Sequence, residues 1–299
     1  MKAIKKVLAV TVALAMVLAM TACSGYKPAS EYTNVTLGGL KIDIRKDMKF
    51  DDSQTNSAGE KVEGYYCDYF GLTVTSESAP MYKITGVEDV DAYLNTVIDA
   101  NNLDSKVETS NNNKYIEYTN SVSGVEYAYT AYGLELGYRF YMVQFFCKSG
   151  EQNKYRDEYE TILKTVELAE VPAETKEITI SGIKMTVGGD VEELSSDQYY
   201  GSNYFISAIS QSLNYPAKDF ADAMISTSQF TTVDGQTPTV TEIEDGIATF
   251  EHYSDEQYAY NYVKSVDGKI VYIIFVTPKA ADDTLKAEFV EIVKNATLA

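Results

Sequence analysis

Apolar and polar residues alternate in the same way in two stretches of the chain, Gly39–Ile44 and Gly182–Val187. Alternation with a period of two is typical of a strand that is buried on one face. The apolar positions are Leu40, Ile42 and Ile44 in the first stretch and Ile183, Met185 and Val187 in the second. Each stretch predicts a strand, and their similarity indicates that the chain contains one unit twice.

A tyrosine-rich strand and then a helix are predicted after each of these strands. The tyrosine-rich segments are YYCDYF at Tyr65–Phe70 and YYGSNYF at Tyr199–Phe205. In the first half, apolar residues from Val90 to Ile98 recur at the spacing of one helix face, and Thr85 with Glu88 form a capping box before them. In the second half, Pro216 fits the first helical position. Fewer residues follow it in register, namely Phe220, Ala223 and Met224.

Three closely spaced strands and a closing helix complete the predicted unit. The strands are expected at Lys114–Thr119, Gly124–Tyr132 and Tyr138–Phe146, and strands so close together pair most simply as an antiparallel meander. The apolar positions of the closing helix recur at a constant offset of 130 in the numbering: Tyr155, Tyr159, Ile162, Leu163 and Val166 become Leu285, Phe289, Ile292, Val293 and Ala296. Within the meander the matches EYAY with QYAY, and Gly137 and Tyr141 with Gly268 and Tyr272, predict an offset of 131 instead.

A repeat of this length is typical of tandem domains and is too long for a solenoid. The predicted organisation is a signal segment at 1–22, a tether at 23–33, a first repeat at 34–169, a linker at 170–176 and a second repeat at 177–299. The linker is polar and contains Pro172, and the first repeat has an additional long loop at Asp51–Gly64. The expected fold class is α+β, with each repeat an antiparallel sheet flanked by helices.

This order of elements resembles the PsbP-like fold, which is named for an extrinsic subunit of photosystem II. The segments that carry the resemblance are GLKIDI, GIKMTV, YRFYMVQFF and KIVYIIFV. The resemblance implies an antiparallel sheet between helical layers, in a family of mostly non-catalytic accessory and binding proteins. It assigns a role to no individual residue, because a fold does not determine a function.

The N-terminus predicts a secretion signal. Three lysines in the first six residues precede an apolar stretch from Val7 to Met20, which is shorter than the ~20 residues of a membrane-spanning helix. The small residues before Cys23 resemble the lipobox of bacterial lipoproteins, although Met20 stands where that motif more often has Leu. The resemblance implies cleavage before Cys23, palmitate-type acyl chains at that residue, and an extracytoplasmic location on the bacterial cell membrane. An ordinary cleaved signal that happens to end at a cysteine is the alternative.

Charge excludes some classes of partner. The 299 residues contain 25 Lys and Arg and 44 Asp and Glu, and removal of the signal segment changes the net charge from -19 to -22. Nucleic-acid binding needs clustered basic residues, so it is not expected. Attraction to anionic lipid headgroups is not expected either, so the lipid on Cys23 is the predicted membrane attachment.

The sequence gives little evidence for a catalytic or metal-binding site. His252 is the only histidine, and no nucleophile motif accompanies it, so an exposed structural histidine is expected. A zinc site needs three or four ligands that the chain does not offer together, and we expect no cofactor or metal. Cys67 and Cys147 are both absent from the second repeat, which fits either a disulfide or two unrelated buried thiols. A disulfide closing this loop would stabilise the fold by roughly 4 kcal/mol.

Tyrosine is the one compositional excess, with 25 Tyr and no Trp. Tyr127 and Tyr129 share a strand face, as do Tyr258, Tyr260 and Tyr262, and these faces are expected to lie under a helix. The alternative is an exposed aromatic platform for a ligand. Its residues would be Tyr65, Tyr66, Tyr69, Tyr199, Tyr200 and Tyr204.

The sequence therefore favours a membrane-anchored lipoprotein that acts as a non-catalytic binding or scaffolding module, with an envelope protein as the expected partner. A module that binds a glycan or peptide through the tyrosine platform is the first alternative. A hydrolase that depends on His252 or on an unidentified carboxylate is the second.

Overall fold

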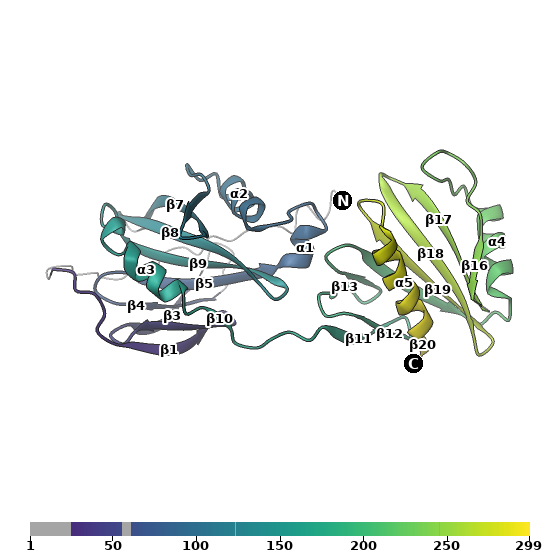
Figure 1. Cartoon of the computed structure of the whole chain (residues 1–299), viewed down its shortest axis with the longest axis horizontal. Helices are drawn as coiled ribbons and strands as arrows, with labels where there is room; N and C mark the ends of the chain where they lie inside the picture. The colour runs from purple at the N-terminus through teal and green to yellow at the C-terminus, as the bar shows by residue number, and fades with distance from the viewer. Residues whose placement is uncertain (1–24, 56–60, 123, 245) are drawn as a thin grey trace. The chain divides into compact units, whose positions relative to one another are not determined.

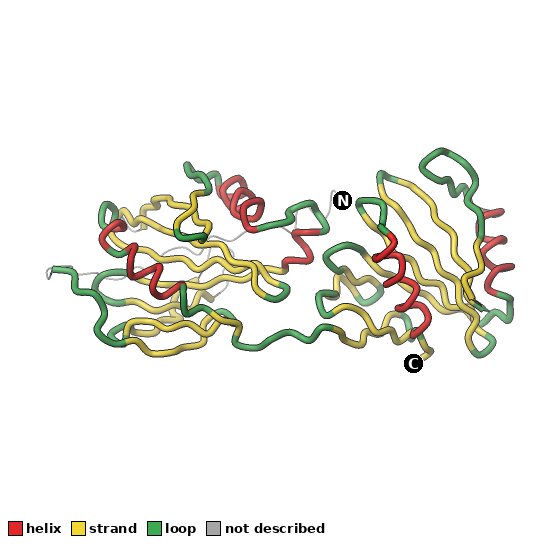
Figure 2. The backbone as a smooth tube through the Cα atoms, viewed as in Figure 1, coloured by secondary structure: helices red, strands yellow, loops and turns green. Residues whose placement is uncertain are grey.

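The computed structural model describes residues 25–299 except 56–60, 123 and 245. The predicted signal segment and Cys23 lie outside the described residues. The chain divides after Pro172 into two compact units, the first formed mainly by the residues up to Pro172 and the second mainly by those from Ala173 onward (Figure 1). In each unit, strands form most of the regular secondary structure and a few helices lie against them (Figure 2).

The first repeat contains two antiparallel sheets. The small sheet has the order β1-β2-β10, and the large sheet has the order β3-β4-β5-β9-β8-β7-β6. The strands are β1 (Tyr32–Leu37), β2 (Leu40–Arg45), β3 (Lys49–Thr55), β4 (Lys61–Tyr66), β5 (Gly71–Ser78), β6 (Glu108–Ser110), β7 (Asn113–Val122), β8 (Val125–Leu136), β9 (Arg139–Lys148) and β10 (Glu167–Leu168). The helices are α1 (Ala79–Lys83), α2 (Val90–Asn101), the 3-10 helix η2 (Gln152–Lys154) and α3 (Arg156–Leu163).

The second repeat has the same two sheets in the same order. The small sheet is β11-β12-β20, and the large sheet is β13-β14-β15-β19-β18-β17-β16. The strands are β11 (Thr175–Ile180), β12 (Ile183–Gly188), β13 (Glu192–Ser195), β14 (Gln198–Tyr200), β15 (Phe205–Gln211), β16 (Thr241–Glu244), β17 (Ile247–Ser254), β18 (Gln257–Val266), β19 (Lys269–Thr277) and β20 (Thr297–Leu298). The helices are α4 (Ala217–Thr227) and α5 (Asp283–Asn295). The predicted fold class, two tandem α+β repeats built on antiparallel sheets with flanking helices, is confirmed.

Each main core lies between the large sheet, the small sheet and the closing helix. In the first repeat, alternate residues of β2 and β9 pack against α3, and in the second repeat those of β12 and β19 pack against α5. The other face of each large sheet is covered in part by α2 or α4. Tyr93, Leu94 and Val97 of α2 are buried, as their helical spacing predicts.

Three aromatic rings mark the same place in both cores. Phe145 of β9 stacks on Tyr159 of α3 with centroids 4.2 Å apart, and Phe70 meets Tyr159 edge-on at 5.0 Å. In the second repeat Phe275 stacks on Phe289 at 4.1 Å, and Tyr204 meets Phe289 edge-on at 5.2 Å. The two stacked pairs are related by the same offset in numbering as the closing helices, which supports that alignment of the repeats.

The offset of 131 predicted within the meander is wrong. Leu136 pairs with Arg139 across one hairpin and Val266 pairs with Lys269 across the other, so the offset of the closing helix, 130, holds there as well. A shift of one residue places side chains on the opposite face of a strand. Tyr260 and Tyr262 lie in the core under α5, as expected for a tyrosine face under a helix, whereas Tyr129 faces the other side of its sheet.

Several predicted boundaries also differ from the structure. The expected loop at Asp51–Gly64 contains most of the hairpin β3–β4, and the three meander strands extend beyond their predicted ends. Asp89 caps α2 in place of the predicted capping box, because its side chain accepts a hydrogen bond from the Ala92 N–H at 2.8 Å. Pro216 directly precedes α4. The helix buries Ala217 and Ala221, while the predicted core position Ala223 is exposed.

Candidate functional site

The end of β2 and the end of β12 form equivalent sites beside the closing helices. In the first repeat the Met48 N–H donates to the Arg45 carbonyl, and in the second the Val191 N–H donates to the Gly188 carbonyl, both at 3.1 Å. Arg45 is therefore equivalent to Gly188. Two carboxylates accompany each site, and the equivalent pairs are Asp47 with Asp190 and Glu158 with Glu288.

The guanidinium of Arg45 joins two carboxylates in the first repeat. Its Nη1 donates to both oxygens of Glu158 at 3.0 Å. Its Nε and Nη2 donate to Asp47 at 2.8 and 2.9 Å. The guanidinium also lies 5.0 Å from the centre of the Tyr69 ring, which adds a cation–π contact. Hydrogen bonds from Arg45 lower the pKa of Asp47, and the set keeps a buried charge compensated, as burial requires.

The N-terminal residues 26–31 form a strap over this site. The Lys27 carbonyl accepts a hydrogen bond from Arg45 Nη1 at 3.0 Å, and the Tyr26 hydroxyl donates to Glu158. The Tyr26 ring packs edge-on against Tyr69 with centroids 5.4 Å apart. Burial, followed by the nearby Glu158 carboxylate, raises the pKa of Tyr26. Glu158 is consequently only 3% exposed, although a cavity of about 500 Å³ remains between the strap and Arg45.

The strap changes the extent of the predicted tether. Tyr26 packs on the core of the first repeat, and Tyr32 and Thr33 are the first residues of β1. The folded part of the chain therefore begins well before Asn34, where the sequence analysis places the start of the first repeat.

The equivalent site in the second repeat is open and acidic. Gly188 supplies no side chain there, and a pocket of about 440 Å³ lies between β12 and α5. Asp190, Glu288 and Glu291 line it together with the apolar Val187 and Ile292, and none of its lining residues is Lys or Arg. Glu288 is exposed, in contrast to the covered Glu158.

The carboxylates of this pocket lack a buried cation. Asp190 accepts a hydrogen bond from the Ser202 N–H at 2.8 Å, and Glu288 accepts one from the Tyr204 hydroxyl at 3.1 Å. Partial burial of its carboxyl group is the largest cause that raises the pKa of Glu288, and the negative charge of Asp190 adds to it. Glu291 lies 3.5 Å from Lys294 Nζ, so the negative charge of the pocket that has no basic partner in the lining belongs to Asp190 and Glu288.

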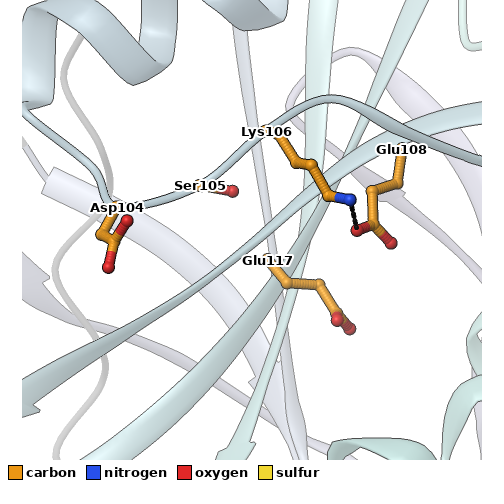
Figure 3. Close-up of a pocket in the computed structure, with 5 residues that line it drawn as sticks. All are labelled: Asp104, Ser105, Lys106, Glu108 and Glu117. Atoms are coloured by element: carbon orange, nitrogen blue, oxygen red, sulfur yellow. Dashed lines mark ion pairs between the residues drawn. The ribbon is translucent and has the colours of Figure 1, made fainter.

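A second polar pocket lies in the first repeat between the loop after α2 and strands β6 and β7. Figure 3 shows the residues that surround its volume of about 380 Å³. Lys106 Nζ lies 3.3 Å from Glu108 Oε1, and Arg156 pairs with Glu117. These charges are largely satisfied within the pocket, so they do not specify a ligand. The lining residues are Asp104, Ser105, Lys106, Glu108 and Glu117.

Cys67 and Cys147 are free, buried thiols in the core of the first repeat. Burial raises the pKa of Cys67, and it raises the pKa of Cys147 to about 12. Both thiols belong to the same hydrophobic core cluster as Tyr155. A disulfide between them stays a prediction.

His252 lies on β17 and is partly buried, so the prediction of an exposed histidine is wrong. Its Nδ1 lies 2.9 Å from the amide nitrogen of the buried Asn261, and the Phe230 ring packs on its ring with centroids 4.5 Å apart. The Tyr272 hydroxyl donates to Asn261 Oδ1, which turns the amide nitrogen toward the histidine. The contacts therefore give His252 a packing role.

The six tyrosines of the predicted platform do not share one exposed surface. Tyr200 and Tyr204 are 5% and 2% exposed, so neither presents a ring face to a ligand. Tyr69 holds Arg45, and Tyr65 packs on the core beside Phe50. Neighbouring residues of one strand point to opposite faces, which separates Tyr65 from Tyr66 and Tyr199 from Tyr200.

Within the part of the chain that the structure describes, no group of three or more His, Cys, Asp or Glu residues is arranged to hold a metal ion. No helix among the same residues is long and apolar enough to cross a membrane.

The arginine site was not predicted from the sequence. Arg45 and Glu158 are 113 residues apart, and neither belongs to a motif. A signal was nevertheless present in the repeat alignment, where Arg45-x-Asp47 stands opposite Gly188-x-Asp190. The chain has three arginines, at positions 45, 139 and 156, and all of them lie in the first repeat.

Comparisons with known proteins give distant structural likenesses. No protein-family model matches the chain, and no curated protein matches it. A crystal structure from Bacteroides thetaiotaomicron VPI-5482 is similar with 13% identity and a TM-score of 0.30, over 48% of this chain and 52% of that one. The chain thus spans about half the length of that structure.

Two further solved structures are similar at comparable levels. The solution structure of cyanobacterial PsbP from Synechocystis sp. PCC 6803 has 11% identity and a TM-score of 0.30, over 49% of this chain and 97% of that one. The immunity protein TplEi of T6SS from Pseudomonas aeruginosa has 9% identity and a TM-score of 0.23, over 89% of this chain and 97% of that one. Likenesses of this degree say nothing about activity or partners.

Proposed function

We propose that this chain is an extracytoplasmic lipoprotein with two PsbP-like repeats that acts as a non-catalytic module and binds a protein partner. One observation carries the binding role: three apolar residues of the second repeat that lie close together in the chain, Ile209, Leu213 and Tyr215, are exposed, and we call them the apolar corner. Their exposed fractions are 46%, 37% and 56%. Exposed apolar residues that gather in one place are typical of interaction surfaces.

The topology explains why this apolar corner is open. Ile206 and Ala208 point into the main core, so Ile209 points to the opposite face of β15. On that face α4 packs mainly on β17 and β18. The segment between β15 and α4 is neither helix nor strand, whereas the first repeat has the helix α1 at the equivalent point of its sequence. Ile209 and the two residues of this segment therefore face solvent.

A capture experiment tests the binding role. The mature chain is crosslinked in bacterial envelope extract, and the crosslinked proteins are identified by mass spectrometry. We expect one protein to be captured by the natural chain and lost with Ile209→Asp or Tyr215→Asp. Val233→Asp is the matched control, because Val233 is 58% exposed in the same repeat but outside the apolar corner. Equal capture by all four proteins would contradict the proposal.

The anchoring part of the proposal rests on the basic and apolar N-terminus and on Cys23. Because the strap begins at Tyr26, the link from Cys23 to the folded part is short and spans at most ~11 Å. The first repeat would then lie close to the membrane. Metabolic labelling with a fatty-acid analogue should mark the natural chain and fail to mark Cys23→Ser, whereas equal labelling of both would rule the anchor out.

A further inference from the structure

The equivalent pair of carboxylates has different hydrogen-bond partners in the two repeats. Asp47 and Glu158 of the first repeat hold the guanidinium of Arg45 through four hydrogen bonds of 2.8–3.0 Å. At the equivalent positions of the second repeat, Asp190 and Glu288 remain, and Gly188 replaces the arginine. Equivalent backbone hydrogen bonds form at both sites. The Lys46 N–H donates to the Glu31 carbonyl, and the equivalent Gly189 N–H donates to the Glu174 carbonyl.

The cover of the site is also missing from the second repeat. Tyr26, which seals Glu158 in the first repeat, corresponds in sequence position to Ala169. Residues 169–174 contain no aromatic and no basic side chain. Since no arginine follows position 156, the second repeat also has no guanidinium of its own to place in the pocket.

We propose that the pocket between β12 and α5 binds the guanidinium group of an arginine side chain supplied by a protein partner. Asp190 and Glu288 take the roles that Asp47 and Glu158 have toward Arg45. Val187 and Ile292 supply an apolar wall for the aliphatic stem of the arginine.

A guanidinium fits this site better than other cations do. Its planar fork of donors can engage two carboxylates at once, as Arg45 does, whereas an ammonium is a point charge. Within the described part of the chain, no cluster of carboxylates, histidines and cysteines is arranged for a metal ion.

The inference deepens the proposed function, because it names the side chain through which a protein partner engages the second repeat. The proposed function and this inference can be contradicted by different experiments. The capture experiment concerns an apolar corner formed by other residues, and the pocket can be tested with a short peptide in the absence of any partner.

The test uses the chain from Ser24 onward, without the signal segment and Cys23, labelled with 15N, and follows its amide signals by NMR. The ligand is acetyl-Gly-Arg-Gly-amide, and the comparison peptide carries citrulline, which has nearly the same shape without the charge. We expect the arginine peptide to shift the signals of Gly189 and Ser202 saturably, since the Ser202 N–H donates to Asp190. The citrulline peptide should bind at least about tenfold more weakly, because charge-assisted bonds are about twice as strong as neutral ones.

Variants locate the binding site. Glu288→Gln and Asp190→Asn should each weaken binding of the arginine peptide by about tenfold. Glu242→Gln is the matched control, since it removes the same charge from the exposed edge strand β16, and it should leave the affinity unchanged. Unchanged spectra outside the pocket show that each variant is folded.

Three outcomes would overturn the inference. The first is the absence of saturable shifts at Gly189 and Ser202. The second is equal binding of the arginine and citrulline peptides, or equal loss in Glu242→Gln and Glu288→Gln. The third is a response of these amides to calcium chloride and none to the arginine peptide, which would assign the pocket to a metal ion.

Discussion

At the scale of single residues, the two repeats exchange the positions of large and small side chains in the contact between the large sheet and the helix on its outer face. A Cβ on Gly133 of β8 would lie 2.7 Å from Val90 and 3.0 Å from Leu94 of α2. The strand therefore has a small residue where the helix has large side chains. The second repeat reverses the sizes, with a large residue on the strand and small residues on the helix. The residues there are Val263, Ala217 and Ala221.

This complementarity predicts the effect of enlarging Gly133. Gly133→Val should lower the free energy of unfolding by about 1–3 kcal/mol, because its side chain overlaps α2. Adding Val90→Ala, which reproduces the arrangement of the second repeat, should recover part of that loss. Urea denaturation of the two single variants and the double variant measures the coupling. Losses that simply add would contradict the exchange.

His252 predicts a pH dependence for the second repeat. Burial lowers its pKa below the usual 6.5, because the charged ring loses water, and Nδ1 already accepts from the Asn261 amide. The unfolded chain then binds the proton at higher pH than the folded chain does. Stability from the neutral ring is therefore complete above about pH 6.5 and is lost as the pH falls through the folded-state pKa.

NMR titration of the single histidine measures that pKa directly. A folded-state value below 6.5, together with a flatter acid limb of stability in His252→Gln, is the expected result. A value at or above 6.5 would show that protonation of the ring costs no stability. The burial of His252 and its contact with Asn261 would then not determine its pKa.

At the scale of elements, buried periodic segments could be predicted from the sequence and polar edge strands could not. The closing helix and the opening strand repeat their apolar spacing, so their position and pairing follow from it. β6 (ETS) and most of β3 (KFDDSQT) carry few apolar residues, and they are strands because the neighbouring strand offers hydrogen bonds. The offset predicted for the meander failed because EYAY and QYAY match in letters but lie on opposite faces.

The candidate site could not be predicted from local sequence patterns either. Arg45, Glu158 and the strap meet only through the folded arrangement of β2, α3 and the N-terminal residues, and no local pattern links them. What the sequence did contain was the contrast between the repeats, an arginine opposite a glycine. A comparison of the two copies by charge, in addition to apolar spacing, would have found the position.

The C-terminus of α5 depends on a lysine from the neighbouring strand. Lys264 Nζ donates to the carbonyls of Val293, Lys294 and Ala296 at 3.1, 2.6 and 2.8 Å. These carbonyls belong to the end of the helix, where backbone acceptors lack partners and a positive charge is favourable.

Removing this amine should therefore loosen the closing helix. Lys264→Met should lower the free energy of unfolding by about 2 kcal/mol and speed hydrogen exchange in the last turn of α5. Lys269→Met is the control, because Lys269 is exposed on β19. If both variants lose the same stability, the carbonyl contacts of Lys264 do not stabilise the helix.

At the scale of the whole molecule, the duplication kept the framework and changed the surface. The strand order, the stacked aromatic pair and the hydrogen bonds after β2 and β12 are the same in both repeats. The differences are the buried arginine and strap in one copy and the acidic pocket and apolar corner in the other. Under the proposed function, the strapped site stabilises the first repeat and the second repeat carries the surfaces that bind the partner.

Because each repeat has its own core, we expect the two to unfold as separate units. The chain carries its own reporters for this. In the chain from Ser24 onward the only thiols, Cys67 and Cys147, are buried in the first repeat, and the only histidine, His252, is in the second. Thiol reactivity in urea thus follows one unit, and the histidine NMR signal follows the other.

Variants in each repeat make the test reciprocal. Gly133→Val should lower the urea midpoint of thiol exposure and leave the midpoint of the His252 signal unchanged, since the overlap with α2 lies in the first core. Lys264→Met should do the reverse, because its carbonyl partners close the second core. With a destabilisation of about 2 kcal/mol and a denaturant slope of ~1–3 kcal/mol/M, the affected midpoint moves by roughly 1 M, which is readily measured. Midpoints that move together in both variants would mean that the two cores unfold as one cooperative unit.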